Sequence, residues 1–182
     1  MYPNRYQQAN SQSGDEKSST GTVPLLEPAD LLRAISGHCS IALPLVRWAR
    51  ELGDLHAELI PFRLNGGSQP KRDADQLRLG IDGVVGEIDA WAARNIQRAR
   101  SARKHTHSLG EVISHMARSY AEAWWIVLHS ADAETWHRAW FHLGEAHEGY
   151  AELLRALRAR HLQLPLGASA FGGALDRCLR GS

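Results

Sequence analysis

The sequence has few cysteines, no excess of either charge and no long apolar run. Its two cysteines, Cys39 and Cys178, lack the paired spacing of a zinc site, which favours free thiols over a structural disulfide. The 21 basic and 20 acidic side chains give a net charge of +1, so no overall field directs the protein towards nucleic acid or anionic lipid. No run of about 18 apolar residues is present, so no membrane span is predicted.

The two ends of the chain differ in composition from its middle. Ser, Gln, Asn and Gly dominate the first residues, which lack the apolar core of a secretory signal, so we expect a cytoplasmic protein. We predict a disordered tail over 1–26, a helical domain over 27–165 and a flexible tail over 166–182. Three apolar residues of the last segment are spaced for one short docking helix: Phe171, Leu175 and Leu179.

The middle of the chain shows helical periodicity, and no window alternates with the period of a strand. A short helix is predicted from Pro28, a favourable first residue, to the stop at Gly37. A second helix is predicted from Pro44 to Pro61, and a third begins at Asp73 in a sequence resembling a capping box.

Two further long helices follow. Ser108 and Glu111 form an S-x-x-E capping box before an apolar stripe, and the last helix is predicted to start after Asp132 and to end by Pro165. Four long amphipathic helices with short polar connections predict an all-α fold. The expected arrangement is an antiparallel bundle of four long helices plus a short N-terminal helix.

Three glycines lie on one flank of the predicted third helix: Gly80, Gly83 and Gly86. Each should cost about 0.5–1 kcal/mol relative to alanine. They indicate either a weak helix, which we favour, or a close approach by a neighbouring helix.

The stretch "KHTHSLGEVISHM" (104–116) raises the question of a metal site. Glu111 and His115 are i, i+4 neighbours, but they lie on the polar face of the predicted helix together with Glu122. His105 and His107 precede the helix cap, and no cysteine or carboxylate cluster completes a ligand set. We therefore interpret the stretch as a helix start and predict no metal and no cofactor.

Two other histidines lie on apolar stripes. His56 falls between Leu52 and Leu59, and His147 lies near Trp140 and Tyr150. We favour hydrogen-bonded core histidines, because buried polar groups are usually paired. The alternative is a small polar pocket in which an imidazole with a shifted pKa handles protons. The candidate residues for that pocket are His56, Tyr120, Trp140, His147 and Tyr150.

Nucleophilic and phosphate-binding motifs are missing. The sequence has no G-x-S-x-G elbow and no Walker or dinucleotide loop. His38 and Cys39 are neighbours, but adjacency alone does not activate a thiol. The sequence therefore favours a protein that is not an enzyme.

A basic run without acids lies between Asp89 and Glu111. Its members are Arg94, Arg98, Arg100, Arg103 and Lys104. The dipole at a helix C-terminus explains some of these cations, and contact with phosphate or an acidic partner is an alternative use for the rest. We favour a solvated basic loop.

Two aromatic residues fall outside the apolar stripes of their helices. Trp125 and Phe141 are expected to be exposed on neighbouring helices, which indicates an apolar patch. Such patches mark oligomer or partner surfaces. The leading hypothesis is therefore a non-enzymatic interaction or scaffold module that forms a homo-oligomer or binds a protein partner. The alternatives are the His56–His147 pocket and phosphate or nucleic-acid contact through the basic run.

Three segments together resemble a known family: "LPLVRWARELGDLHAE" (43–58), "GEIDAWAARNI" (86–96) and "HTHSLGEVISHMA" (105–117). They are similar to the actinobacterial branch of the uncharacterised domain-of-unknown-function family 4254, over roughly residues 29–165. The matching residues are His56, Glu87, Asp89, Trp91, His105, Leu109 and Gly110. The sequence departs from the family pattern at His107, usually an acid there, and at Ser114-His115, often Asp-Arg. The resemblance implies an α-helical bundle and no established activity.

Overall fold

The computed structural model describes residues 25–64, 71–99 and 101–165. Within these ranges the chain is mostly helical, which confirms the all-α class. The helices are α1 (Pro28–Ile35), α2 (Pro44–Leu64), α3 (Lys71–Asn95), α4 (Leu109–His129) and α5 (Ala133–Arg158). Two two-residue strands, β1 (Arg103–Lys104) and β2 (Leu162–Gln163), pair in parallel.

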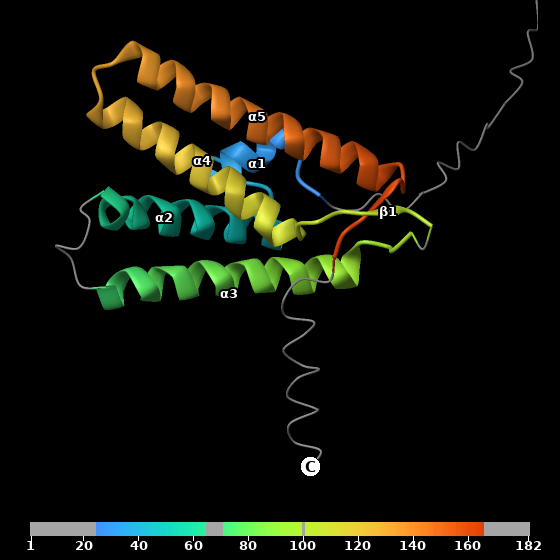
Figure 1. Ribbon diagram of the computed structural model, residues 1–182. Coiled ribbons are helices and arrows are strands. Elements are labelled where there is room, and N and C mark those ends of the chain that lie inside the picture. The colour runs from blue at the N-terminus through green and yellow to red at the C-terminus, as the bar shows by residue number, and fades with distance from the viewer. Residues whose placement is uncertain (1–24, 65–70, 100, 166–182) are drawn as a thin grey trace, which may run out of the picture.

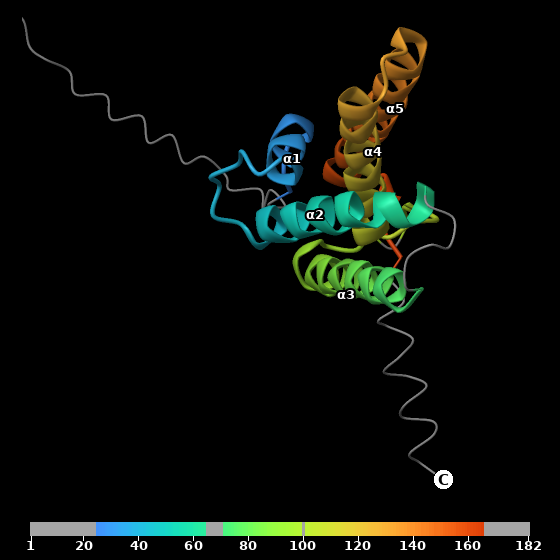
Figure 2. The same ribbon diagram turned by 90° about the vertical axis from the view of Figure 1, so that its left-hand side faces the viewer.

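The long helices form two hairpins, α2–α3 and α4–α5, which cross each other (Figures 1 and 2). The first half of α4 packs across α2 and α3, and α1 lies in contact with α2, α4 and α5. Within the described residues α5 makes no close backbone contact with α2 or α3, and only its last turn, at Leu157, lies beside the end of α3. The predicted four-helix bundle arrangement is therefore not confirmed, because in a closed bundle α5 would also border the first hairpin.

The core lies where the two hairpins cross. Ile113 and Met116 of α4 belong to one buried cluster with Leu52 of α2 and Ile88 of α3, and α1 contributes Leu31 and Ile35 to the same cluster. These residues recur at helical spacing, so each helix buries one stripe. The outer half of the α4–α5 hairpin, which consists of the end of α4 and the start of α5, extends beyond this core, as Figure 2 shows.

The N-terminal boundary of the domain lies earlier than predicted. Leu25 and Leu26 are buried, and the Tyr150 hydroxyl donates a hydrogen bond of 2.8 Å to the Leu26 carbonyl oxygen. The predicted tail over 1–26 is thus too long by these two residues. Residues 1–24 and the predicted docking segment over 166–182 lie outside the described residues.

Two helix boundaries also differ from expectation. Pro61 does not stop α2, which continues to Leu64. A proline one turn from a helix end removes a single backbone hydrogen bond near a terminus that already frays, so the stop signal is weak there. Helix α3 begins at Lys71, two residues before the predicted Asp73.

The cap predictions for α4 and α5 are confirmed, whereas Asp73 lies inside the first turn of α3 and does not cap it. The Ser108 side chain accepts from the Glu111 backbone at 3.2 Å, and the Glu111 carboxylate accepts from the Ser108 backbone at 2.7 Å. Asp132 caps α5 by accepting from the backbone of Glu134 and Thr135. No helix in the described part of the chain has the length and hydropathy needed to cross a membrane.

The glycine flank of α3 is not a helix-packing site. A Cβ added to Gly83 or Gly86 would meet nothing within 4 Å, and one at Gly80 would make only ordinary contact with Leu55. The interpretation as a weak helix is therefore supported. The close approach occurs instead at Gly110, where a Cβ would lie 2.5 Å from the Val85 carbonyl oxygen.

Candidate functional site

Two acids of the "EIDAW" segment join the helices. The Glu87 carboxylate accepts a hydrogen bond from the Trp48 indole and contacts Arg47 at 3.3 Å, linking α3 to α2. Asp89 is buried and accepts from the Gly110 backbone N–H at 2.8 Å, linking α3 to the first turn of α4. Burial raises the pKa of Asp89, while hydrogen bonds from Ser108 and Gly110 oppose the rise. Both acids therefore have structural partners.

His56 is a buried, hydrogen-bonded histidine, as the favoured interpretation predicted. It is 8% exposed, and its Nε2 lies 2.9 Å from the Ser114 hydroxyl of α4. This partner was not predicted from the sequence. Burial, followed by the positive charge of Arg118, lowers the pKa of His56 to about 4. The ring is neutral at physiological pH.

The structure does not bring the five predicted pocket residues together. His56 lies beneath two clefts of about 300 and 680 Å³ that border α3 and α4, and His147 lines neither of them. His147 is half-buried on α5, a helix that does not approach α2. Trp140 is 47% exposed, and the buried Tyr150 bonds Leu26. Tyr120 packs against the core from α4.

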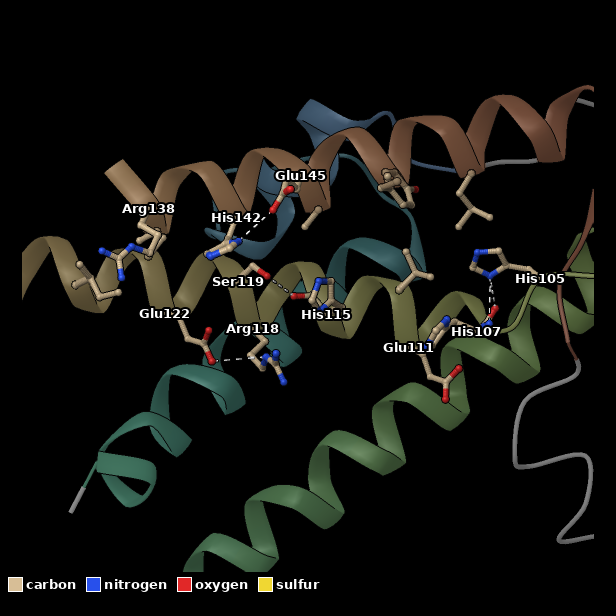
Figure 3. Close-up of a pocket in the computed structure, with 18 of the residues that line it drawn as sticks. His105, His107, Glu111, His115, Arg118, Ser119, Glu122, Arg138, His142 and Glu145 are labelled. Carbon is tan, nitrogen blue, oxygen red and sulfur yellow. Dashed lines mark hydrogen bonds and ion pairs between the residues drawn. The ribbon is translucent and has the colours of Figure 1, made fainter. Parts of the chain in front are cut away.

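A groove of about 940 Å³ lies between α4 and α5 (Figure 3). Its apolar lining includes Val112, Ala123, Ile126, Ala139, Ala146 and Leu153. Its polar lining comes from three segments: the loop before α4, the outer turns of α4 and the facing turns of α5. These polar residues include His105, His107, Glu111, His115, Arg118, Glu122, Arg138, His142 and Glu145.

The histidine-rich stretch of the sequence forms one end of this groove. His105 Nδ1 lies 2.8 Å from the carbonyl oxygen of His107, and Glu111 is held by the capping box. On the α5 side, His142 Nδ1 lies 3.1 Å from the Glu145 carboxylate. Among the described residues, no three His, Cys, Asp or Glu side chains converge on a point where a metal ion would sit.

The outer half of the α4–α5 hairpin carries a second notable surface, which we call the tryptophan face: Trp124, Leu128, Trp136 and Trp140. These side chains are 39% to 61% exposed. Trp124 and Leu128 continue the stripe of α4 that is buried at Ile113 and Ala117. On α5, the two tryptophans continue the stripe buried at Leu143 and Leu154. The apolar stripes of α4 and α5 are thus covered by other helices near the core and exposed in the outer half of the hairpin.

The tryptophan face is not the apolar patch predicted from the sequence, which was expected at Trp125 and Phe141. Phe141 is 57% exposed, as predicted. Trp125 is half-buried and stacks on His129 at 3.8 Å between ring centroids, while its neighbour Trp124 is 49% exposed. Periodicity assigns Trp124 to the same stripe of α4 as the buried Ile113, but the structure leaves Trp124 exposed.

The basic run is exposed where the structure describes it. Arg94 lies in the last turn of α3, Arg98 follows the helix, and Arg103 and Lys104 form β1. Arg100 lies outside the described residues. Parallel pairing of β1 with β2 holds this loop beside the end of α5. Phosphate contact by the run stays a prediction.

No family model, curated protein or solved structure matches the chain. The resemblance to the domain-of-unknown-function family 4254 therefore stays a prediction. Of its matching residues, His56, Glu87, Asp89 and Gly110 make the contacts between helices described above, Trp91 and Leu109 are buried, and His105 lines the α4–α5 groove.

Sequence reasoning missed the groove and the tryptophan face. The groove joins a polar stripe of α4 to one of α5, and each stripe alone is an ordinary solvated helix face. The sequence shows that Trp136, Trp140 and Leu143 share one face of α5. It gives one sign that this face is exposed near the α4–α5 turn, which is the presence there of three tryptophans.

Proposed function

We propose that the protein is a non-enzymatic helical interaction module that associates with a second copy of itself through the tryptophan face. The observation that carries this proposal is the exposure of three tryptophans and a leucine on a stripe that is buried elsewhere in the same helices. Large apolar patches of this kind are unusual on monomers and typical of interfaces.

A second copy is the favoured partner because, within the described part of the chain, the outer half of the α4–α5 hairpin has no neighbouring helices on its apolar side. Two further helices would be needed to cover it. Two such hairpins placed face to face supply each other with them, and the result is a four-helix arrangement built from two chains. The contact is then isologous, so that one patch serves both copies. The antiparallel four-helix packing predicted from the sequence would in this proposal form between chains.

The size of the face fits the core of such an interface. At the exposed fractions above, the three tryptophans offer roughly 300 Å² of surface per copy. A standard interface buries about 800 Å² per partner, so the face would form its apolar centre and the flanking polar residues its rim. Burying it would contribute about 7 kcal/mol per copy, comparable with the ~4–15 kcal/mol cost of association.

The test is the size of three matched proteins by chromatography with light scattering. We expect the wild type to be a dimer and Trp140→Ser to be a monomer. Phe141→Ser is the control, because Phe141 is somewhat more exposed than Trp140 on the same helix but lies about 100° around the helix from it. A wild-type monomer, or equal weakening by both substitutions, would contradict the proposal.

A further inference from the structure

We propose that the α4–α5 groove binds an iron porphyrin, with His142 as the axial ligand. The porphyrin has three chemical features: a metal that needs axial ligands, a flat apolar ring and two carboxylate side chains. The groove presents a matching group for each of them.

The histidines of the groove suit a metal whose other ligands come from the cofactor itself, as the four ring nitrogens of a porphyrin do. Four histidines line it, from the loop before α4, from α4 and from α5: His105, His107, His115 and His142. They are spread along its length, and no three metal-binding side chains among the described residues converge on one point. A bare ion would find no coordination sphere, whereas a porphyrin iron needs only one or two imidazoles.

His142 is oriented for this role. Its Nδ1 lies 3.1 Å from the carboxylate of Glu145, one turn further along α5 (Figure 3). Donation of the Nδ1 proton to this carboxylate selects the tautomer whose Nε2 has a free lone pair. A carboxylate on the second nitrogen is the usual arrangement behind a metal-bound histidine, and it raises the basicity of the ligand.

The groove has the dimensions and surface for the ring. Its volume of about 940 Å³ falls within the range of cofactor sites. Its floor is apolar, with Val112 and Ile126 on α4 and the small side chains of Ala139 and Ala146 on α5. Gly149 of α5 also lines the groove, and a Cβ added there would meet nothing within 4 Å. The space beside this residue is therefore open to a ligand.

Two arginines of the walls suit the propionate groups. Arg118 of α4 and Arg138 of α5 both line the groove. Glu122, which lies near Arg118 at 3.6 Å, is also paired with Arg63 of α2, so its negative charge is shared between two cations. Arg138 has only a distant contact of 3.9 Å with Glu134.

The groove and the tryptophan face lie on different sides of the hairpin. On α5, Arg138 and His142 each follow a tryptophan of the face by two residues, which is about 200° around the helix. Self-association through the face therefore leaves Arg138 and His142 accessible, although Ala139 of the groove lining borders the face.

The experiment is a titration of the full chain with haemin, followed by its Soret absorbance. We expect saturation at one haemin per chain. His142→Ala should bind at least tenfold more weakly, and Arg138→Gln severalfold more weakly. The matched control is His137→Ala, an exposed histidine of the same helix that does not line the groove. Circular dichroism melting checks that each variant is folded.

Three results would overturn the proposal. The first is the lack of a saturable Soret change at one equivalent. The second is equal weakening by His137→Ala and His142→Ala, which would indicate adventitious binding to surface histidines. The third is unchanged affinity in His142→Ala with a loss in His115→Ala, which would remove His142 as the axial ligand.

Discussion

His56 should make the folded state sensitive to mild acid. Its folded pKa is about 4, against 6.5 for an unperturbed histidine, because the ring is buried and lies near Arg118. Below pH 6.5 the unfolded chain takes up a proton that the folded chain does not. Stability is therefore complete above pH 6.5 and falls progressively as the pH is lowered towards 4.

The magnitude follows from the two pKa values. The gap between 6.5 and about 4 sets an upper limit of about 3 kcal/mol for the whole effect. Between pH 7 and pH 5, the contribution of His56 to the free energy of unfolding should fall by about 2 kcal/mol. That is a substantial part of the stability of a domain of this size.

The assay is urea unfolding at pH 7 and at pH 5, at a fixed protein concentration, for the wild type and His56→Gln. Glutamine retains a hydrogen-bonding group for Ser114 but does not titrate. We expect the wild type to lose about 2 kcal/mol more than the variant between the two pH values. His137→Gln is the control, because His137 is exposed on α5 and is not among the groups that shift the pKa of His56, so its removal should leave the wild-type loss unchanged. An equal loss in the wild type and His56→Gln would refute the reasoning.

Two further predictions concern glycines. Gly110→Ala should lower the free energy of unfolding by about 2–3 kcal/mol in urea unfolding, because the added Cβ would lie 2.5 Å from the Val85 carbonyl oxygen and 2.9 Å from Asp89. Gly83→Ala should raise it by about 0.5–1 kcal/mol, since Gly83 is an exposed helical residue with open space around its Cβ position. A neutral Gly110→Ala or a destabilising Gly83→Ala would contradict these contacts.

Local signals in the sequence predicted local structure well. The capping box of Ser108 and Glu111 was predicted because both partners lie within one turn, and the structure contains both of its hydrogen bonds. The burial of His56 followed from helical phase alone. Its partner Ser114 did not, because 58 residues separate the two and only the packing of α4 on α2 brings them together.

The tryptophan face and the groove could not be predicted, because both depend on where one helix ends relative to its neighbours. Periodicity assigns Trp124 and Ile113 to the same stripe of α4, yet Ile113 is buried and Trp124 is 49% exposed. The difference arises because α2 covers only the first half of α4, which no pattern within α4 records. The groove has the same origin, since it exists only where α4 and α5 lie side by side.

The most direct test of the central claim is the mass of the wild-type chain by sedimentation equilibrium over a wide concentration range. A surface made to pair with a second copy should give twice the chain mass of 20.2 kDa, with dissociation towards the monomer on dilution. Trp124→Ser should move this dissociation to higher concentration. A mass of 20.2 kDa at every concentration would contradict self-association through the tryptophan face.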